Sequence, residues 1–142
     1  MSDLRLFMKG NKKKKENEKY APTVSLTDEN GKPLEWEFKH ITSKENEELR
    51  DECTTEVPVT GKFGMYRNKT NGSRYVKKLI IASIVFPDLD NTELQSSYGV
   101  MGAEDLLMEL VDDPGEYADL AQFVQKMQGF KTLQEDVDEA KN

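Results

Sequence analysis

Apolar and polar residues alternate on both sides of a turn sequence in the first third of the chain. The alternating apolar positions are Val24, Leu26, Leu34, Trp36 and Phe38. Between the two runs lies Asn30-Gly31, the pair typical of a tight type I′ turn in which both residues have positive φ. The pattern predicts an antiparallel β-hairpin over residues 23–41. Because an isolated hairpin is marginal in water, its apolar face needs cover from elsewhere in the chain.

Helical patterns follow the hairpin. Thr42 and Glu45 have the spacing of a capping box, which predicts a helix over about residues 43–53. Apolar residues at helical spacing predict another over residues 74–86, although the β-branched run at residues 80–85 would also suit a buried strand. Residues 56–72 have three glycines, one proline and no sustained period, so we expect a connecting loop there.

Start and stop signals divide the remaining sequence into short helices. Asp90 or Asn91 caps a helix over residues 91–97, and the next covers residues 103–111. Asp113 and Pro114 fit the cap and first position of a helix over residues 114–128, which Gly129 ends. Thr132 opens a last helix over residues 132–141.

Together these elements predict an α+β fold, in which an N-terminal antiparallel β-hairpin packs against several short α-helices and the C-terminal two-thirds is helix-rich. The length of 142 residues suits one domain, which we place at residues 20–142. Residues 1–19 are expected to form a flexible, basic N-terminal segment. Within it, Leu4, Phe7 and Met8 have helical spacing behind a cap at Ser2.

Charge is unevenly distributed along the chain. The net charge is -7, yet residues 1–20 carry seven basic and three acidic side chains, so they contribute +4 and the rest -11. The lysine run at residues 12–15 has no interleaved aromatic residues for stacking on bases, and the acidic remainder repels phosphate. The sequence thus predicts no nucleic-acid partner. It also has no apolar run of membrane-spanning length and no signal peptide, so we expect a cytoplasmic protein without a membrane partner.

Candidate catalytic and metal-binding motifs fail on spacing. Gly61-Lys62 lacks the earlier glycine and the following Ser or Thr of a phosphate-binding loop, and residues 88–99 lack the glycine and glutamate of a calcium loop. His40 and Cys53 are the single histidine and cysteine, so neither has a partner for a zinc site. We expect both to be structural. The sequence predicts no enzyme activity, catalytic residue, metal or cofactor.

Several ordered blocks resemble the XkdN-like phage tail assembly chaperone family of PBSX type. The blocks are residues 7–14, 28–36, 41–43, 49–54, 82–107, 114–117 and 128–130. The resemblance covers nearly the whole chain, and residues 68–74 match least well.

The resemblance implies a phage or prophage protein of the bacterial host cytosol that binds the tape measure protein and keeps it soluble during long-tail assembly. The resemblance also allows the tail tube protein as a second partner, and it leaves open whether the chain self-associates. The alternative is a small structural or adaptor component that is retained in the tail.

The partner-binding surface is a separate hypothesis. Pro87 and Gly99 interrupt an apolar segment, and such irregular segments are more often presented than buried. The predicted partner-binding residues are therefore Leu89, Leu94, Tyr98, Val100 and Met101. A packed helical corner is the alternative for this segment. Similarly, Met101, Met108 and Met127 form either an adaptable groove for partner helices or filler in the core.

Overall fold

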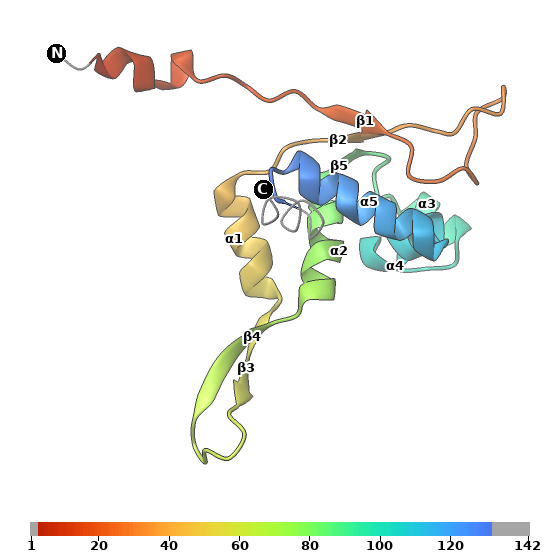
Figure 1. Ribbon diagram of the computed structural model, residues 1–142. Helices are drawn as coiled ribbons and strands as arrows, with labels where there is room; N and C mark the ends of the chain where they lie inside the picture. The colour runs from red at the N-terminus through yellow and green to blue at the C-terminus, as the bar shows by residue number, and fades with distance from the viewer. Residues whose placement is uncertain (1–2, 132–142) are drawn as a thin grey trace, which may run out of the picture.

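The computed structural model describes residues 3–131 and confirms the α+β fold, with N-terminal strands and a helix-rich C-terminal part (Figure 1). A three-stranded sheet has the order β1-β2-β5, and a separate two-stranded hairpin is formed by β3 and β4. Five α-helices complete the fold in the described part of the chain. The helix predicted at residues 132–141 lies outside the described residues.

The sheet joins segments that are distant in sequence. Strand β2 (Trp36–Phe38) lies between β1 (Glu18–Tyr20) and β5 (Ile84–Phe86), and both pairings are antiparallel. Tyr20 is opposite Trp36, and Phe38 is opposite Ile84. The predicted N-terminal strand pairing is therefore wrong in its partner, because β2 pairs with residues 18–20 instead of residues 23–26.

The segment predicted as the first hairpin strand packs on a helix instead. The Thr23 hydroxyl and the Val24 N–H donate to the Glu116 carboxylate at 2.8 and 2.9 Å, which holds this segment against the start of α5 (Pro114–Met127). The turn end of the predicted hairpin 23–41 remains, with a bridge between Thr27 and Pro33. Backbone hydrogen bonds also join the Leu34 N–H to the Leu26 carbonyl at 2.9 Å and the Asp28 N–H to the Lys32 carbonyl at 2.8 Å. Only at Thr23 and Val24 does a charge-assisted contact with Glu116 replace the expected ladder.

The turn within this segment also differs from the predicted type I′. Gly31 has a φ of 80°, but no non-glycine residue between residues 3 and 131 has positive φ, so Asn30 does not. The Asp28 carboxylate accepts the N–H groups of Asn30 and Lys32 at 2.8 and 3.0 Å. The aspartate side chain organises the reversal, which removes the need for two left-handed residues.

Helix starts agree closely with the sequence signals. Helix α1 (Ser43–Glu52) has a complete Thr42/Glu45 capping box, and Asn91 caps α3 (Thr92–Ser97). Asp113 caps α5, which begins at Pro114, and α4 spans Ala103–Leu110. Gly129, with a φ of 90°, follows the end of α5. These local signals are reliable here because each satisfies orphan backbone groups at one helix end.

The segment predicted as a helix over residues 74–86 contains two elements. Helix α2 (Gly72–Ser83) starts earlier, capped by Asn71, and ends at Ser83. The remaining residues form β5. The prediction was wrong at its end because Ile84 pairs with Phe38 of β2, and this tertiary contact decides between two conformations that the β-branched run allows.

The loop predicted over residues 56–72 is mostly a second hairpin. Strand β3 (Thr54–Pro58) pairs in register with β4 (Tyr66–Thr70), and Thr54 and Thr70 share a hydroxyl hydrogen bond of 2.8 Å. Every residue of β4 is exposed. The sequence did not predict these strands because neither face of the hairpin is buried. Burial of one face is what makes apolar and polar residues alternate along a strand. Figure 1 shows this hairpin projecting from the body beyond α1 and α2.

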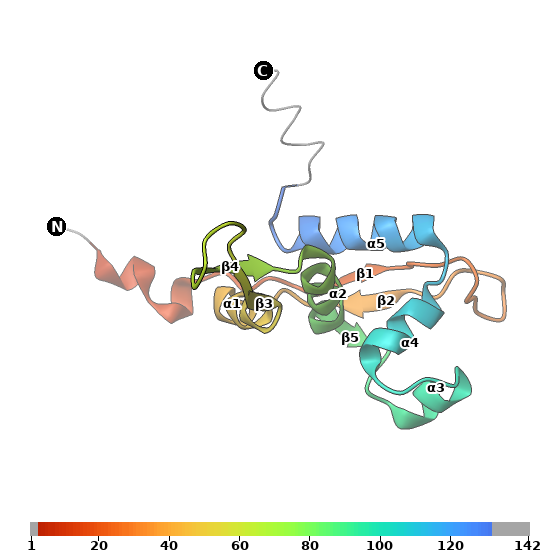
Figure 2. The same cartoon turned by 90° about the horizontal axis from the view of Figure 1, so that it is seen from below.

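An aromatic cluster joins the sheet to α5, which runs alongside β1 and β2 in Figure 2. Phe38 is fully buried, and its ring contacts those of Tyr20, Trp36 and Phe123. Tyr20 stacks on Phe123 with ring centroids 4.2 Å apart. The aliphatic core continues from this cluster through α2, α4 and α5, and its buried members are Leu79, Ile80, Leu89, Leu106, Leu107, Leu110, Val111, Leu120 and Val124. The buried residues of α5, Leu120 and Val124, thus face this core.

Gln128, just after α5, ties three segments together. Its side-chain oxygen accepts the Ile41 N–H at 3.0 Å, and its amide donates to the Lys39 carbonyl and the buried Ser83 hydroxyl, both at 2.9 Å. Each intramolecular hydrogen bond contributes about 1 kcal/mol net.

We expect Gln128→Ala to lower the free energy of unfolding by about 2 kcal/mol, because the substitution removes three bonds while water replaces only the exposed partners. Urea denaturation of both proteins measures this difference. The matched control is Gln122→Ala at an exposed position of α5, which should change the free energy by less than about 0.5 kcal/mol. An equal loss in both variants would contradict the role given to Gln128.

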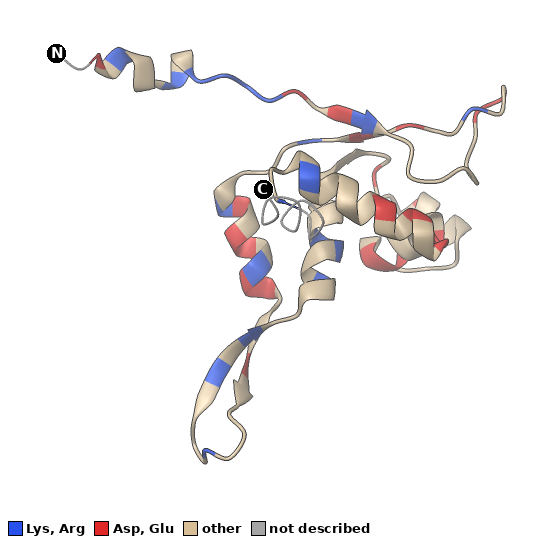
Figure 3. Ribbon diagram, in the orientation of Figure 1, with Lys and Arg blue, Asp and Glu red and all other residues tan. Residues whose placement is uncertain are grey.

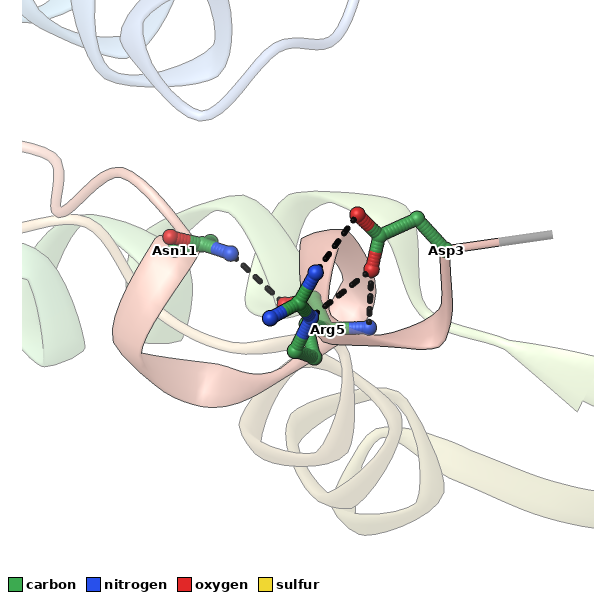
Figure 4. A network of polar contacts seen from close by, with 3 residues as sticks. All are labelled: Asp3, Arg5 and Asn11. Carbon is green, nitrogen blue, oxygen red and sulfur yellow. Dashed lines mark hydrogen bonds and ion pairs between the residues drawn. The ribbon is translucent and has the colours of Figure 1, made fainter. Parts of the chain in front are cut away.

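The N-terminal segment folds on itself locally. Its short 3-10 helices span Leu4–Phe7 and Lys9–Asn11, and the Asp3 carboxylate caps the first and pairs with Arg5 (Figure 4). Asn11 donates to the Arg5 carbonyl at 2.6 Å. The amphipathic segment expected here as a helix is thus two 3-10 turns with Asp3 as its cap, and Leu4, Phe7 and Met8 remain exposed.

Three tyrosines make the free energy of unfolding depend on pH in the alkaline range. Burial raises the pKa of Tyr20, Tyr75 and Tyr117 above the ordinary value of 10.0, and Asp119 and Glu116 add to the rise at Tyr20. The folded state therefore holds these phenol protons more tightly than the unfolded state does. We expect the free energy of unfolding to be unaffected by these groups below pH 10.0 and to fall above it. Urea midpoints measured on both sides of that pH test this, and a rising midpoint would contradict it.

Candidate partner-binding surface

The structure separates the five predicted partner-binding residues into different environments. Leu89 is only 4% exposed and belongs to the core, while Leu94, Tyr98 and Val100 are half-buried against it. Met101 is 89% exposed. Gln95 organises this segment, because its side chain donates to the Leu89 carbonyl at 2.8 Å and accepts the Gly102 N–H at 3.0 Å. Leu89 is therefore not available at the surface, and Met101 is.

A hollow with a partly apolar lining lies where three helices meet. We call it the α2–α4–α5 groove, and its volume is about 1000 Å³. Its apolar lining comes from Val76, Met108, Tyr117, Ala118 and Ala121. Its polar lining comes from Asn71, Ser73, Arg74, Lys77, Glu104, Gln122, Gln125 and Lys131. The groove is lined by both apolar and polar side chains, as sites for amphipathic helices are.

Helix periodicity explains how the groove forms. On α4, Leu106, Leu107 and Leu110 point into the core, so the neighbouring Met108 is left 40% exposed on the outer side. On α5, Leu120 and Val124 are buried, and the adjacent Ala118 and Ala121 leave space because their side chains are small. The depression therefore results from small residues beside a buried helix face.

A second hollow of about 380 Å³ adjoins the first. Met101 lines it together with Leu49, Ile81 and Ala103, and Glu104 lines both hollows. Of the three methionines considered from sequence, Met127 packs against the core, Met108 lines the groove and Met101 lines the second hollow. They do not form one common groove.

The tip of the β3–β4 hairpin is a third exposed apolar feature. Phe63, Met65 and Tyr66 are exposed there, next to turns at Gly61 and Gly64, which have φ values of 77° and 78°. Lys62 is at the same tip. The sequence analysis did not predict this feature, because the segment was interpreted as a loop. The closely spaced aromatic residues of the segment were the signal that could have indicated it.

Opposite charges gather at different parts of the molecule. Figure 3 shows acidic residues on α3, α4 and α5, and basic residues on the N-terminal segment, β4 and α2. No lysine or arginine occurs between Lys78 and Lys126, whereas that stretch contains ten acidic residues. The α2–α4–α5 groove lies at the boundary, with Arg74 and Lys77 along its α2 side.

The structure shows the surroundings of His40 and Cys53, the two residues considered for a zinc site. His40 Nε2 lies 3.3 Å from a Glu18 carboxylate oxygen, and Cys53 is buried. Within residues 3–131, no three His, Cys, Asp or Glu side chains lie close enough to hold a metal ion. In the same range, no helix combines the length and apolar character needed to cross a membrane.

The structure is that of a small α+β protein with a hollow where α2, α4 and α5 meet. Comparison with known proteins identifies the family: the chain belongs to the phage XkdN-like tail assembly chaperone proteins, which match it over residues 4–141. The resemblance seen in the sequence blocks is thereby confirmed. The elements that form the groove all lie within the matched range.

Two proteins of Bacillus subtilis (strain 168) are similar along nearly their full lengths. Phage-like element PBSX protein XkdN is 28% identical over 141 residues, covering 99% of this chain and 94% of that protein. Protein YqbN is 25% identical over 138 residues, covering 97% and 91%. The crystal structure of YqbN superimposes with a TM-score of 0.75 at 21% identity, covering 92% of this chain and 99% of that chain. This superposition supports the fold.

Proposed function

We propose that this protein binds the tape measure protein in the cytoplasm of the bacterial host and keeps it soluble while a long phage tail assembles. The observation that carries the proposal is membership of the tail assembly chaperone family over residues 4–141. Its action is binding, without a chemical reaction. The tail tube protein is a second partner that meets the complex during assembly.

The apolar surface features support such a role physically. A chaperone of this kind has to cover apolar side chains of an unfinished partner, and burial of apolar surface provides about 25 cal/mol per Å². The α2–α4–α5 groove and the hollow beside Met101 offer concave apolar surface on one body. The acidic surface of α3–α5 adds mutual repulsion between loaded complexes, which favours solubility (Figure 3).

We propose the α2–α4–α5 groove as the main contact and the Met101 hollow as its extension. Glu104 lines both, so one partner helix can cross from the first to the second. The exposed methionines suit this task because a flexible thioether adapts to varied apolar partners.

Met101→Gln tests the extension. Met101 is 89% exposed, so the free energy of unfolding should change by less than about 0.5 kcal/mol. Affinity for a tape measure fragment should fall about threefold to tenfold, because an apolar contact becomes a polar one. Isothermal titration measures the affinity. Unchanged binding by the well-folded variant would remove Met101 from the site.

The composition of assembly intermediates and finished tails tests the function. An affinity-tagged chain should co-purify with the tape measure protein from induced cells and should be missing from purified complete tails. Mass spectrometry of both fractions provides the measurement. Stoichiometric recovery from finished tails would contradict the chaperone role and support a retained structural or adaptor component. Failure to co-purify with the tape measure protein would refute the proposed partner.

A further inference from the structure

The tip of the β3–β4 hairpin carries apolar side chains that the described chain leaves open to solvent. Phe63 is fully exposed, and Met65 and Tyr66 are more than half exposed. Aromatic residues, methionine and arginine are enriched at the buried centres of protein interfaces, and Arg67 follows directly in the sequence. A two-stranded hairpin is also only marginally stable in water by itself. The tip therefore has the composition of an interface, and burial against another protein surface would stabilise it.

The charge around the hairpin narrows the kind of surface that it fits. Residues 57–78 contain six basic residues and no acidic residue. The six are Lys62, Arg67, Lys69, Arg74, Lys77 and Lys78. Among residues 3–131, no ion pair joins the three on the hairpin to a carboxylate. A complementary surface is therefore acidic and contains an apolar hollow.

The Met101 hollow of this same protein has that chemistry. Its apolar lining consists of Leu49, Ile81, Ala82, Met101 and Ala103. Glu104 and Asp105, in the first turn of α4, also line it, and neither forms an ion pair with another described residue. Lys78 is the cation of the described lining, and it is paired with Glu52 at 3.2 Å. The two carboxylates are therefore left to attract a positively charged partner.

We propose that the tip of the β3–β4 hairpin binds the Met101 hollow of a second copy of this chain. Phe63 of one copy lies against Met101 of the other. Lys62 and Arg67 face the two carboxylates of the hollow, Glu104 and Asp105.

The position of the hairpin favours a contact between copies over a contact within one chain. The hairpin projects from the body beyond α1 and α2 (Figure 1). The hollow is lined by those two helices and the start of α4, so the tip lies away from the hollow of its own chain.

Each copy carries both surfaces, so two copies related by a twofold axis make the contact twice. Twofold dimers are the commonest protein oligomers. A specific interface usually buries at least about 1,000 Å² in total, and a hairpin tip is small, so the doubled contact matters. We expect a closed dimer with a Kd on the order of micromolar.

The dimer has a consequence for partner binding, because the Met101 hollow is also the proposed extension of the tape measure contact. A tape measure helix that covers this hollow competes with the hairpin of the second copy. This consequence rests on the proposed function, whereas the dimer contact concerns the free chain alone.

Sedimentation equilibrium of the purified full-length chain, without any partner protein, tests self-association. At roughly 100 μM protein, well above a micromolar Kd, we expect the mass of two chains. Raising the salt concentration from about 0.05 to 0.5 M should weaken the dimer several-fold, because salt screens exposed ion pairs. The mass of a single chain at both salt concentrations would overturn the proposal. Since no tape measure protein is present, the result is independent of the proposed function.

A charge exchange tests which surfaces meet. Lys62→Glu with Arg67→Glu, and separately Glu104→Lys with Asp105→Lys, should each weaken the dimer at least tenfold, because like charges then face each other. An equimolar mixture of the two variants should restore dimers, since both contacts of a mixed pair join opposite charges. Folded variants that dimerise normally alone, or that stay monomeric when mixed, would contradict the assigned contact.

Lys12→Glu with Lys14→Glu is the matched control for the hairpin variant. Both residues are exposed in the N-terminal segment, so the same change in net charge is made far from the tip. This control should dimerise within about twofold of the unmodified chain. Circular dichroism accompanies every variant, because acidic residues in the first turn stabilise a helix and Glu104 and Asp105 begin α4. An equal loss in the control would show that net charge alone governs the association.

Disulfide trapping locates the contact. A Phe63→Cys chain is mixed with a Met101→Cys chain, and oxidised glutathione supplies the oxidant. The control mixture replaces the second chain by Val24→Cys, which alters a side chain that is 72% exposed. Peptide mass spectrometry should show the link between positions 63 and 101 forming at least ten times faster than the link between positions 63 and 24. Equal rates, or a link between two copies of position 63 that forms fastest, would overturn the proposal.

Discussion

Phe38→Ala is expected to lower the free energy of unfolding by about 3–5 kcal/mol, the range for truncating a fully buried phenylalanine. Phe38 is 0% exposed, and its ring contacts Tyr20 of β1 and Phe123 of α5. The substitution leaves a cavity where the sheet meets the helix, so the transfer and cavity terms add. A domain of this size has a total stability of only about 5–15 kcal/mol, so the variant should be largely unfolded at moderate urea concentrations.

Phe86→Ala is the matched control for this experiment. Phe86 lies on the neighbouring strand β5 and is 66% exposed, so the same truncation should cost well under about 1 kcal/mol. Urea denaturation followed by tryptophan fluorescence compares both variants, because Trp36 lies beside Phe38. Similar losses in the two variants would contradict the placement of Phe38 at the centre of the core.

Ala118→Arg is expected to weaken partner binding at least tenfold, which corresponds to about 1.4 kcal/mol. Ala118 is exposed on α5 and lines the α2–α4–α5 groove, so an arginine there fills the space that the small residue leaves. Arginine is also a good helix former, so α5 should persist. Titration of a tape measure fragment measures affinity, and circular dichroism measures the retained fold.

Glu109→Arg controls for the new positive charge. Glu109 is exposed on α4 beside Met108 but does not line the groove. This variant should bind within about twofold of the unmodified chain, the change expected for a charge at the rim of an interface. A folded Ala118→Arg protein that binds normally, or an equal loss in both variants, would show that the partner contacts another surface.

Local signals in the sequence predicted the helices well. Thr42, Asn91 and Asp113 each cap the helix that follows, because a cap depends on hydrogen bonds within a few residues. The family, and with it the broad function, could likewise be read from residue blocks spread along the chain. These features depend on neighbouring residues or on overall similarity, and both are visible without coordinates.

Strand pairing could not be predicted in the same way. The partners of β2 are residues 18–20 and 84–86, and nothing local in Trp36–Phe38 selects them over residues 23–26. The β3–β4 hairpin has no buried face, so its strands lack the alternation that burial imposes. Both cases depend on tertiary context, which decides β-structure more strongly than intrinsic preference does.

The candidate site was the least predictable feature. The irregular apolar segment between residues 89 and 101 predicted the partner-binding residues, yet Leu89 is buried in the core. The Gln95 side chain holds this segment by a hydrogen bond to the Leu89 carbonyl. The groove depends on Val76, Met108 and Ala121, which belong to three helices and are brought together only by folding. Sequence identified Met108 as a candidate for partner contact, but it could not identify the neighbours that give it a concave setting.

Solubility of the tape measure protein upon co-expression tests the central claim most directly. The tape measure protein is expressed alone, with the unmodified chain and with Ala118→Arg, and its soluble fraction is measured after centrifugation. We predict that the unmodified chain raises the soluble fraction several-fold and that Ala118→Arg largely abolishes the rise. A tape measure protein that is equally insoluble with and without the unmodified chain would contradict the proposed chaperone function.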